Sequence, residues 1–270
     1  MGKKRHNIWL ILAALVVAIP FIPLVLWAFA GEWRFPELLP TEFSLRGWEQ
    51  IISGGNRVPE AVLNSLIIGV AATAASVAVG LPAGMAIGGY EFRFKGAVIF
   101  LILLPILVPP LASTMGIHLT FIRLGLSDTV FGVFLVHLIP TVPYTAIILT
   151  SVFADMTGEM EEAARSLGAS PWQAFRHVTL PQAVPGIAVA ALFAFLVSWS
   201  QYILTVLIGG GSVITLPMLL FSAASGSDPV ITSVLAILFA LPALVVLVVA
   251  LRFLRGGGDE SGMIGLGKPS

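Results

Sequence analysis

Three residues near the end of the sequence have the spacing of a nucleotide-binding loop. Gly262, Gly267 and Lys268 fit the pattern G-x-x-x-x-G-K, in which backbone N–H groups and the lysine hold phosphates. That chemistry also needs a Ser or Thr after the lysine to bind Mg²⁺, a preceding strand and a following helix. Pro269 takes the hydroxyl position, and neither the strand nor room for the helix is present. We therefore expect this chain to bind no ATP and to hold no cofactor of its own.

Acid–base and metal chemistry also have few candidates. The absence of cysteine excludes disulfides and thiolate metal sites. All fourteen acidic residues lie outside the long apolar runs or at their ends, whereas ion-coupled secondary transporters need carboxylates inside the membrane. His118 and His137 do lie inside such runs, where a lone histidine is more often a helix-to-helix hydrogen-bond donor than a relay. An ion-coupled transporter stays an alternative, while an intramembrane enzyme would lack a metal site or acid–base pair, so we predict no catalytic residue.

The polar segment 155–181 lies between two apolar runs and carries helix start and stop signals. Four side chains recur at the spacing of one helical face: Met160, Ala163, Ala164 and Leu167. Glu161 and Arg165 are four residues apart, in the order that stabilises a helix by about 0.2–0.5 kcal/mol. Gly168 follows in the position of a left-handed C-terminal cap. The pattern predicts a short amphipathic helix ending at this glycine.

A second short helix is predicted to start at Pro171, because Ser170 and Gln173 are spaced as a capping box. Its apolar stripe consists of Trp172, Phe175 and Val178, and Pro181 is expected to end it. Neither stripe is long enough to cross a membrane. Each has to be buried against the chain's own membrane helices, in the membrane interface or in a groove of a partner protein. The residues alone leave these possibilities open.

The apolar runs around this segment indicate an integral membrane protein. Of the 270 residues 57% are hydrophobic and 10% charged, with a mean hydropathy of +1.00, whereas soluble domains are about 25% charged. A membrane-spanning helix needs roughly 20 apolar residues. Six runs satisfy this, at about 8–30, 61–88, 97–120, 129–153, 184–208 and 229–253. We predict an all-α integral membrane fold with six transmembrane helices in one domain, residues 1–255. The net charge of zero gives no indication of a nucleic-acid partner.

The positive charges predict the orientation of these helices in the cytoplasmic (inner) membrane. With six spans, four cationic residues lie on the side opposite the termini: Arg34, Arg46, Arg57 and Arg123. The remaining Lys and Arg lie on the side of the termini, which the positive-inside rule places in the cytoplasm together with segment 155–181. The first run is longer than a signal-peptide core of about 7–15 residues, so we expect it to remain uncleaved. The glycine-rich residues 256–270 are expected to form a flexible cytoplasmic tail.

Three further stretches suggest how the helices pack. Aromatic side chains among charges in residues 31–60 fit short helices at the membrane surface or a docking surface for an external partner. Dense Gly, Ala, Ser and Thr in 64–90 predict a helix packed closely on others, kinked at Pro82. Pro105, Pro109 and Pro110 are expected to disrupt and bend the third helix, as a pathway lining or as a structural kink.

Segment 155–181 resembles the cytoplasmic signature loop of membrane permease subunits in binding-protein-dependent ABC importers. That pattern is Glu-Ala-Ala, three residues, Gly, nine residues and Ile-x-Leu-Pro. Here it reads Glu162-Ala163-Ala164, Gly168 and 178-Val-Thr-Leu-Pro-181, with valine for isoleucine. The family often has a proline before the acidic run, where this chain has "DMTGEMEE". The resemblance extends from "LNSL" at 63–66 to the last helix.

The resemblance implies that this helix-turn-helix, between helices 4 and 5, is a coupling helix docked on a separate ATP-hydrolysing subunit. Glu162 would contact a basic residue there, and ATP-driven closure would rock the membrane helices between inward- and outward-facing states. The implied coupling residues are Glu161, Glu162, Ala163, Ala164, Gly168, Trp172, Phe175, Leu180 and Pro181. The implied partners are two ATPase copies, a second permease that we expect to be a homologue, and an extracytoplasmic solute-binding protein.

Polar residues at the start of helix 2 and within helix 5 are candidates for the solute pathway, although any one of them could instead join two helices. The candidates are Asn64, Ser65, Trp199, Ser200, Gln201 and Tyr202. The region after Trp199 is similar to permeases of the polyamine, iron, thiamine and sulfate branch, which implies a small polar or charged solute. Sugar permeases commonly have Asn, and polyamine permeases Asp, where this chain has Ser200 or Gln201. Because these neutral groups cannot neutralise an amine, a sugar stays an alternative.

Overall fold

The computed structural model describes residues 19, 21–33, 36–53, 57–108, 110–156 and 158–259, with the backbone alone for 110–113 and 246–259. Within these residues the regular secondary structure is helical, and the β structure is limited to an isolated bridge between Ala30 and Phe43. It forms two compact units. We call residues 63–215 the central unit, and residues 1–62 with 216–270 the flanking unit.

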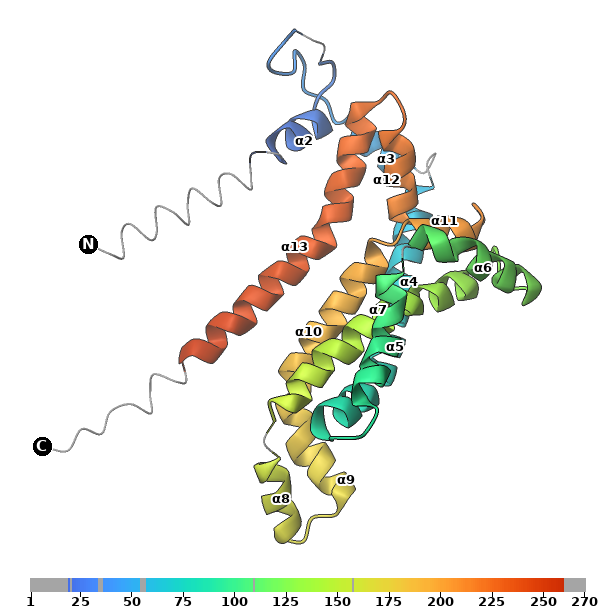
Figure 1. Ribbon diagram of the computed structural model, residues 1–270. Coiled ribbons are helices and arrows are strands. Elements are labelled where there is room, and N and C mark those ends of the chain that lie inside the picture. The colour runs from blue at the N-terminus through green and yellow to red at the C-terminus, as the bar shows by residue number, and fades with distance from the viewer. Residues whose placement is uncertain are drawn as a thin grey trace, which may run out of the picture. The chain divides into compact units, whose positions relative to one another are not determined.

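Three helices among the described residues are long and apolar enough to cross a membrane, and most of their length lies in the central unit. The first is α4, Val58–Gly89, and the second is α7, Val130–Ala154. The third runs from Pro171 to Trp199 and comprises α9 (Pro171–Ala174), a π-helical turn η1 (Phe175–Thr179) and α10 (Leu180–Trp199). Helices α4 and α7 cover the predicted spans 61–88 and 129–153 to within a few residues (Figure 1).

The predicted third span is broken, as the prolines indicated. Helix α5 (Lys95–Leu107) ends before Val108, which is extended with φ −78° and ψ 125°, and α6 (Pro110–Arg123) follows. A residue before a proline is disfavoured in the helical region, so the Pro109-Pro110 pair separates the two helices.

Two expectations about the fifth span were wrong. The span 184–208 is not continuous, because α10 ends at Trp199 and α11 (Ile203–Gly209) begins after an irregular stretch. Pro181 does not end the preceding helix. In the wide π turn the N–H of Leu180 donates to the carbonyl oxygen of Phe175. The helix then continues through Pro181.

The flanking unit contains α2 (Phe21–Ala28), α3 (Arg46–Ile52), α12 (Leu216–Ala224) and α13 (Pro229–Asp259). Helix α13 covers the predicted span 229–253 and continues through 256–259, which were expected to belong to a flexible tail. Most of the predicted span 8–30, and residues 260–270, lie outside the described residues.

A bidentate ion pair joins α3 to the start of α13 in the flanking unit. Arg46 donates to the two carboxylate oxygens of Asp228 at 2.9 and 3.1 Å. Partial burial would raise the pKa of Asp228, but the hydrogen bonds from Arg46 and the N–H of Val230 outweigh it and hold the pKa below its usual value.

Small residues bring α4 close to α7, as their density predicted. A Cβ on Gly80 would lie 2.6 Å from Thr145 Oγ1, and one on Gly84 would lie 2.6 Å from Leu149 Cβ. Only this face of α4 is buried, since Leu63, Ile67 and Val70 on its other face are exposed. Contact at this distance allows hydrogen bonds between the two helices.

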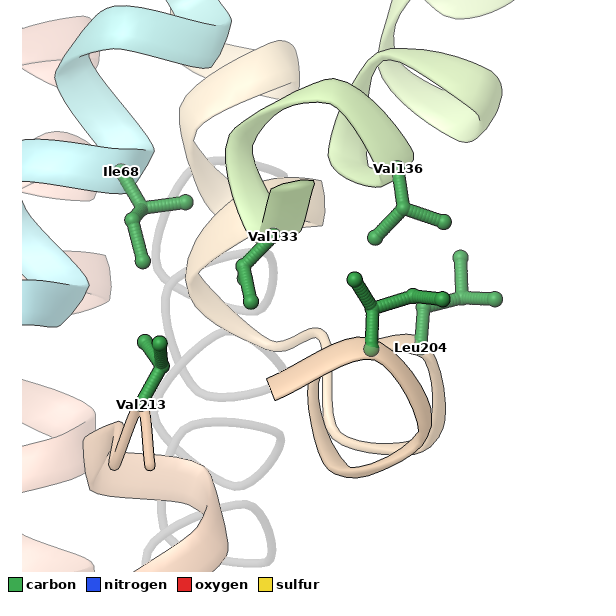
Figure 2. Packing of buried hydrophobic residues seen from close by; sticks show 6 residues of the cluster. Ile68, Val133, Val136, Leu204 and Val213 are labelled. Carbon is green, nitrogen blue, oxygen red and sulfur yellow. The ribbon is translucent and has the colours of Figure 1, made fainter. Parts of the chain in front are cut away.

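The apolar core of the central unit has one cluster at each end of α7. The cluster near the start of α7 consists of Ile68, Val133, Val136, Leu204, Ile208 and Val213, and it packs α4 and α11 on α7 (Figure 2). The cluster near its other end consists of Leu149, Phe153, Ala183 and Ala190, and it packs α10 on α7. Beyond that second end, α8 (Glu159–Ser166) and α9 project past α7 and α10 (Figure 1).

Candidate functional site

The projecting segment is a helical hairpin, residues 158–179, whose turn forms as the sequence predicted. Gly168 has φ +94°, a conformation that disfavours residues with a Cβ. Its N–H donates to the carbonyl oxygen of Arg165 at 3.0 Å, and the N–H of Ala169 donates to that of Ala164 at 3.1 Å. These two bonds form a Schellman motif that satisfies the last carbonyls of α8.

The second helix of the hairpin starts with the predicted capping box. The N–H of Gln173 donates to Ser170 Oγ at 3.3 Å, and the N–H of Ser170 donates to Gln173 Oε1 at 2.8 Å. Pro171 occupies the first turn, where its missing N–H costs nothing. The turn is therefore stabilised on both sides by its own backbone and side chains.

The apolar side chains of the hairpin are largely uncovered. Met160 is 66% exposed, Leu167 90% and Trp172 64%. Glu162 and Ala163 are exposed beside them, while Ala164, Phe175 and Leu180 are half-buried. The stripes predicted for this segment are thus not buried against the chain's own membrane helices. Their exposure in a polar segment is typical of a protein–protein interface.

Glu161 ties the first helix of the hairpin to the second. Thr179 Oγ1 donates to its carboxylate at 2.7 Å, and Thr179 is buried. The expected partner of Glu161 was Arg165, but the carboxylate faces the π turn instead. A cavity of about 370 Å³ lies beside this contact, lined among others by Met85, Tyr90 and Gln182. The bond from Thr179 closes the base of the hairpin, and Gln182 Nε2 of α10 contacts Met160 Sδ of α8 at 3.2 Å.

Four of the pathway candidates lie at the break between α10 and α11. Trp199 is buried and stacks on Phe195 with ring centroids 5.7 Å apart. Ser200 is exposed, and its Oγ donates to the carbonyl oxygen of Val197 at 3.3 Å. Gln201 and Tyr202 are half-buried. We call Ser200, Gln201 and Tyr202 the break; the N–H groups of Ser200 and Gln201 still donate to carbonyl oxygens of α10, so the polar groups that the break offers are its side chains.

Asn64 and Ser65 lie near the start of the apolar part of α4. Asn64 Nδ2 donates to the carbonyl oxygen of Ile214 at 3.0 Å, so its amide joins α4 to the segment after α11 rather than to the break. Ser65 is buried. Four of the six candidates are thus neighbours only because they are consecutive in the chain, and the side chain of Asn64 binds a different segment.

From the sequence, His137 was either a hydrogen-bond donor between helices or a proton relay, and the structure shows its hydrogen bonds. The residue is 1% exposed on α7, with Nδ1 2.7 Å from Ser198 Oγ and Nε2 2.9 Å from Thr205 Oγ1. This is the helix-to-helix bonding that we favoured for a lone membrane histidine. In the sequence, the polar residues Ser198 and Thr205 in otherwise apolar helices were the only indication of these bonds. The two residues reach His137 because the helix is interrupted between them. His118 lies half-buried on α6.

The chain is similar to known transport proteins. The family described as "Binding-protein-dependent transport system inner membrane component" matches residues 80–255. The trehalose transport system permease protein SugB of Mycobacterium tuberculosis is 29% identical over 84% of this chain and 85% of its own length. The spermidine/putrescine transport system permease protein PotC of Haemophilus influenzae is 28% identical over 76% and 80% of the two chains.

Among solved structures, a chain of a bacterial ABC transporter involved in the import of the acidic polysaccharide alginate has the same fold. It superposes with a TM-score of 0.73 at 20% identity, and the match covers 93% of this chain and 95% of the other. The likeness to this importer establishes the all-helical permease fold.

Proposed function

Since this chain belongs to the family of binding-protein-dependent transport system inner membrane components, a family of ABC importer permeases, we propose that it forms half of a solute pathway and couples it to a separate ATPase through residues 159–181. The chain itself would be a non-catalytic subunit. Its family membership and its apolar helices both indicate a multi-pass protein of the inner membrane.

The observation that carries the coupling role is the exposed apolar surface of the hairpin. Leu167 and Trp172 are well exposed on a segment whose polar composition does not suit lipid. Burying such side chains in a groove contributes about 25 cal/mol per Å² of apolar surface. Glu162, exposed on the same helix, would pair with a basic residue at the edge of that groove. Both termini and the hairpin would face the cytoplasm, where ATP is hydrolysed.

The full assembly would contain two ATPase copies, a second and homologous permease, and an extracytoplasmic solute-binding protein. The exposed apolar face of α4, with Leu63, Ile67 and Val70, leaves surface for lipid or for another membrane subunit. The family description itself names dependence on a binding protein.

We propose a small polar or charged solute, of the polyamine, thiamine, iron or oxyanion type. A sugar is the second candidate, because the break carries neutral groups and because the relative SugB is named for trehalose. Hydroxyl and amide groups such as those of Ser200 and Gln201 suit hydrogen bonding to a neutral solute. Uptake assays with labelled trehalose and labelled spermidine, each with the cognate binding protein, would separate the two classes.

Co-purification tests the coupling role. The tagged chain is expressed with its genomic neighbours and purified in mild detergent, and the ATPase activity that co-purifies is measured. We expect Leu167→Asp to lose the ATPase subunit, because a carboxylate would be buried in an apolar groove. Leu38→Asp is the matched control, since Leu38 is equally exposed, at 90%, on the segment predicted to lie outside. Retention of the ATPase by both variants, or its absence from the unchanged chain, would refute the proposal.

A further inference from the structure

A buried histidine joins the two helices on either side of the break. His137 lies on α7, and its ring nitrogens contact Ser198 in the last turn of α10 and Thr205 in the first turns of α11. Both hydroxyl partners are buried. A side chain that only joined two helices would need one such contact. Contacts on both sides of an interruption hold its two ends at a fixed separation.

The hydrogen-bond network defines where the protons lie. Thr205 Oγ1 donates its one hydrogen to the carbonyl oxygen of Gln201 at 2.8 Å. Thr205 must therefore accept from His137, which places the ring proton on Nε2. In the neutral ring Nδ1 then accepts from the hydroxyl of Ser198. The bonds run in one direction, from Ser198 through His137 and Thr205 to the backbone of Gln201 in the break.

The helix that carries His137 is itself held firmly. Thr141 Oγ1 donates to the carbonyl oxygen of His137 at 2.8 Å and lies 2.6 Å from Ser76 Oγ on α4. Thr145 Oγ1, one turn further, donates to the carbonyl oxygen of Ser76 at 3.0 Å. The polar contacts thus continue from the break to α4.

Apolar packing surrounds this polar network. Figure 2 shows Val136 of α7 directed toward Leu204 of α11, with Val133 alongside. Val136 directly precedes the histidine, Val133 lies one helical turn before it, and both are fully buried. In such surroundings a hydroxyl that loses its partner has no water to replace it, so the bonds of His137 are costly to break.

We propose that His137 is a positioning residue, which sets the backbone conformation of the break and hence how Ser200 and Gln201 face the solute pathway. The inference rests on the proposed function, because it assumes that the break lines that pathway. His137 would act through Thr205 on Gln201 and would not touch the solute.

The natural absence of cysteine offers a direct test. A Gln201→Cys variant keeps the backbone carbonyl that Thr205 binds, and it can be labelled with a small charged methanethiosulfonate reagent. The full chain, expressed with its genomic neighbours, is labelled in membrane vesicles, and the labelling rate is compared after adding His137→Leu, Thr205→Val or both. We expect each single change to alter the rate about 5-fold or more, because an unpaired buried group shifts local equilibria by this much. The double change should add little to the effect of Thr205→Val alone, since His137 would act on Gln201 only through Thr205.

Two comparisons separate positioning from general loosening. His137→Gln, which keeps a donor and an acceptor, should leave the rate nearer to that of the unchanged background. Thr145→Val removes a buried hydroxyl from the same helix that bonds α4 and not the break, and should leave the rate unaltered. If His137→Leu does not assemble, Thr205→Val alone carries the test.

The outcomes are distinct. Unaltered labelling with His137→Leu and Thr205→Val, additive effects, or an equal effect of Thr145→Val would overturn the positioning role while leaving the pathway assignment intact. A cysteine at 201 that the reagent never reaches in the otherwise unchanged chain would overturn the pathway assignment, and this inference with it.

Discussion

The hairpin and the break treat polar and apolar side chains in opposite ways. The hairpin lies in a polar segment and leaves Leu167 and Trp172 uncovered, while its own backbone groups are satisfied by caps. The break lies between apolar helices and is held by buried polar side chains, His137 and Thr205. Apolar surface left exposed outside lipid indicates a missing partner, and polar groups buried inside the membrane part indicate that the chain holds itself. We therefore expect the hairpin to be completed by another protein, whereas the break is held by side chains of this chain.

The largest expected effect is on partner binding at the hairpin. Trp172→Ala removes an exposed aromatic side chain, and aromatic residues at the centre of an interface often contribute about 2 kcal/mol or more. We expect the affinity for the ATPase subunit to fall about 30-fold, while the melting temperature of the isolated chain stays the same. Titration of the purified permease with its ATPase subunit, together with thermal unfolding in detergent, measures both. A lower melting temperature would mean that Trp172 is part of the chain's own core.

The opposite pattern is expected at the break. His137→Leu removes the bonds that Ser198 and Thr205 make to the ring nitrogens, while Thr205 keeps its bond to Gln201, and should destabilise the chain by about 1–2 kcal/mol. The ATPase subunit should still co-purify, because the hairpin is unaltered. Thermal unfolding and co-purification of the same preparation measure the two quantities. Loss of the ATPase subunit with unchanged stability would mean that the break, and not only the hairpin, takes part in partner binding.

A smaller effect is expected from the turn of the hairpin. Gly168→Ala places a Cβ on a residue with φ +94°, which costs about 1 kcal/mol. The cost should be confined to the hairpin, since a Cβ at this position meets no neighbouring atoms. Hydrogen exchange should therefore increase in 159–174 and remain unchanged in α7. Gly89→Ala, where the added Cβ also meets open space, serves as the control.

The smallest expected effect separates coupling from binding. Thr179→Val removes the hydroxyl that binds Glu161 and keeps the shape of the side chain, at a cost of about 0.5–1.5 kcal/mol. We expect the ATPase subunit to bind normally, while solute-stimulated ATP hydrolysis falls because α8 is held less firmly to the π turn. Comparing basal and stimulated hydrolysis in liposomes measures this. Equal losses of both activities would mean that the contact serves binding instead.

Local signals in the sequence were sufficient where the structure depends on local physics. Apolar length predicted α4 and α7, the adjacent prolines predicted the interruption after Leu107, and the residues around Gly168 predicted the hairpin turn with its caps. Each of these features depends on residues within a few positions of one another. Membership of an importer family could likewise be inferred from the spacing in 162–181, and the family match confirms it.

The features that the sequence did not reveal depend on distant contacts. Helix α10 stops at Trp199 where polar side chains meet His137, which lies more than sixty positions earlier. Glu161 pairs with Thr179, eighteen positions away, rather than with Arg165 on its own helix. The π turn that carries the chain past Pro181 has no residue pattern of its own. These features arise from tertiary packing, which a pattern of near neighbours does not contain.

The unbroken path from Pro171 to Trp199 makes the hairpin one end of a lever. A helix of 29 residues is roughly 43 Å long at 1.5 Å per residue. Tilting such a rod by about 5° around one end moves the other by roughly 4 Å, which is more than the length of a hydrogen bond. The far end of this rod is the residue before the break. A tilt too small to dislodge Trp172 from a partner would therefore be enough to stretch the contacts of His137 beyond hydrogen-bonding distance.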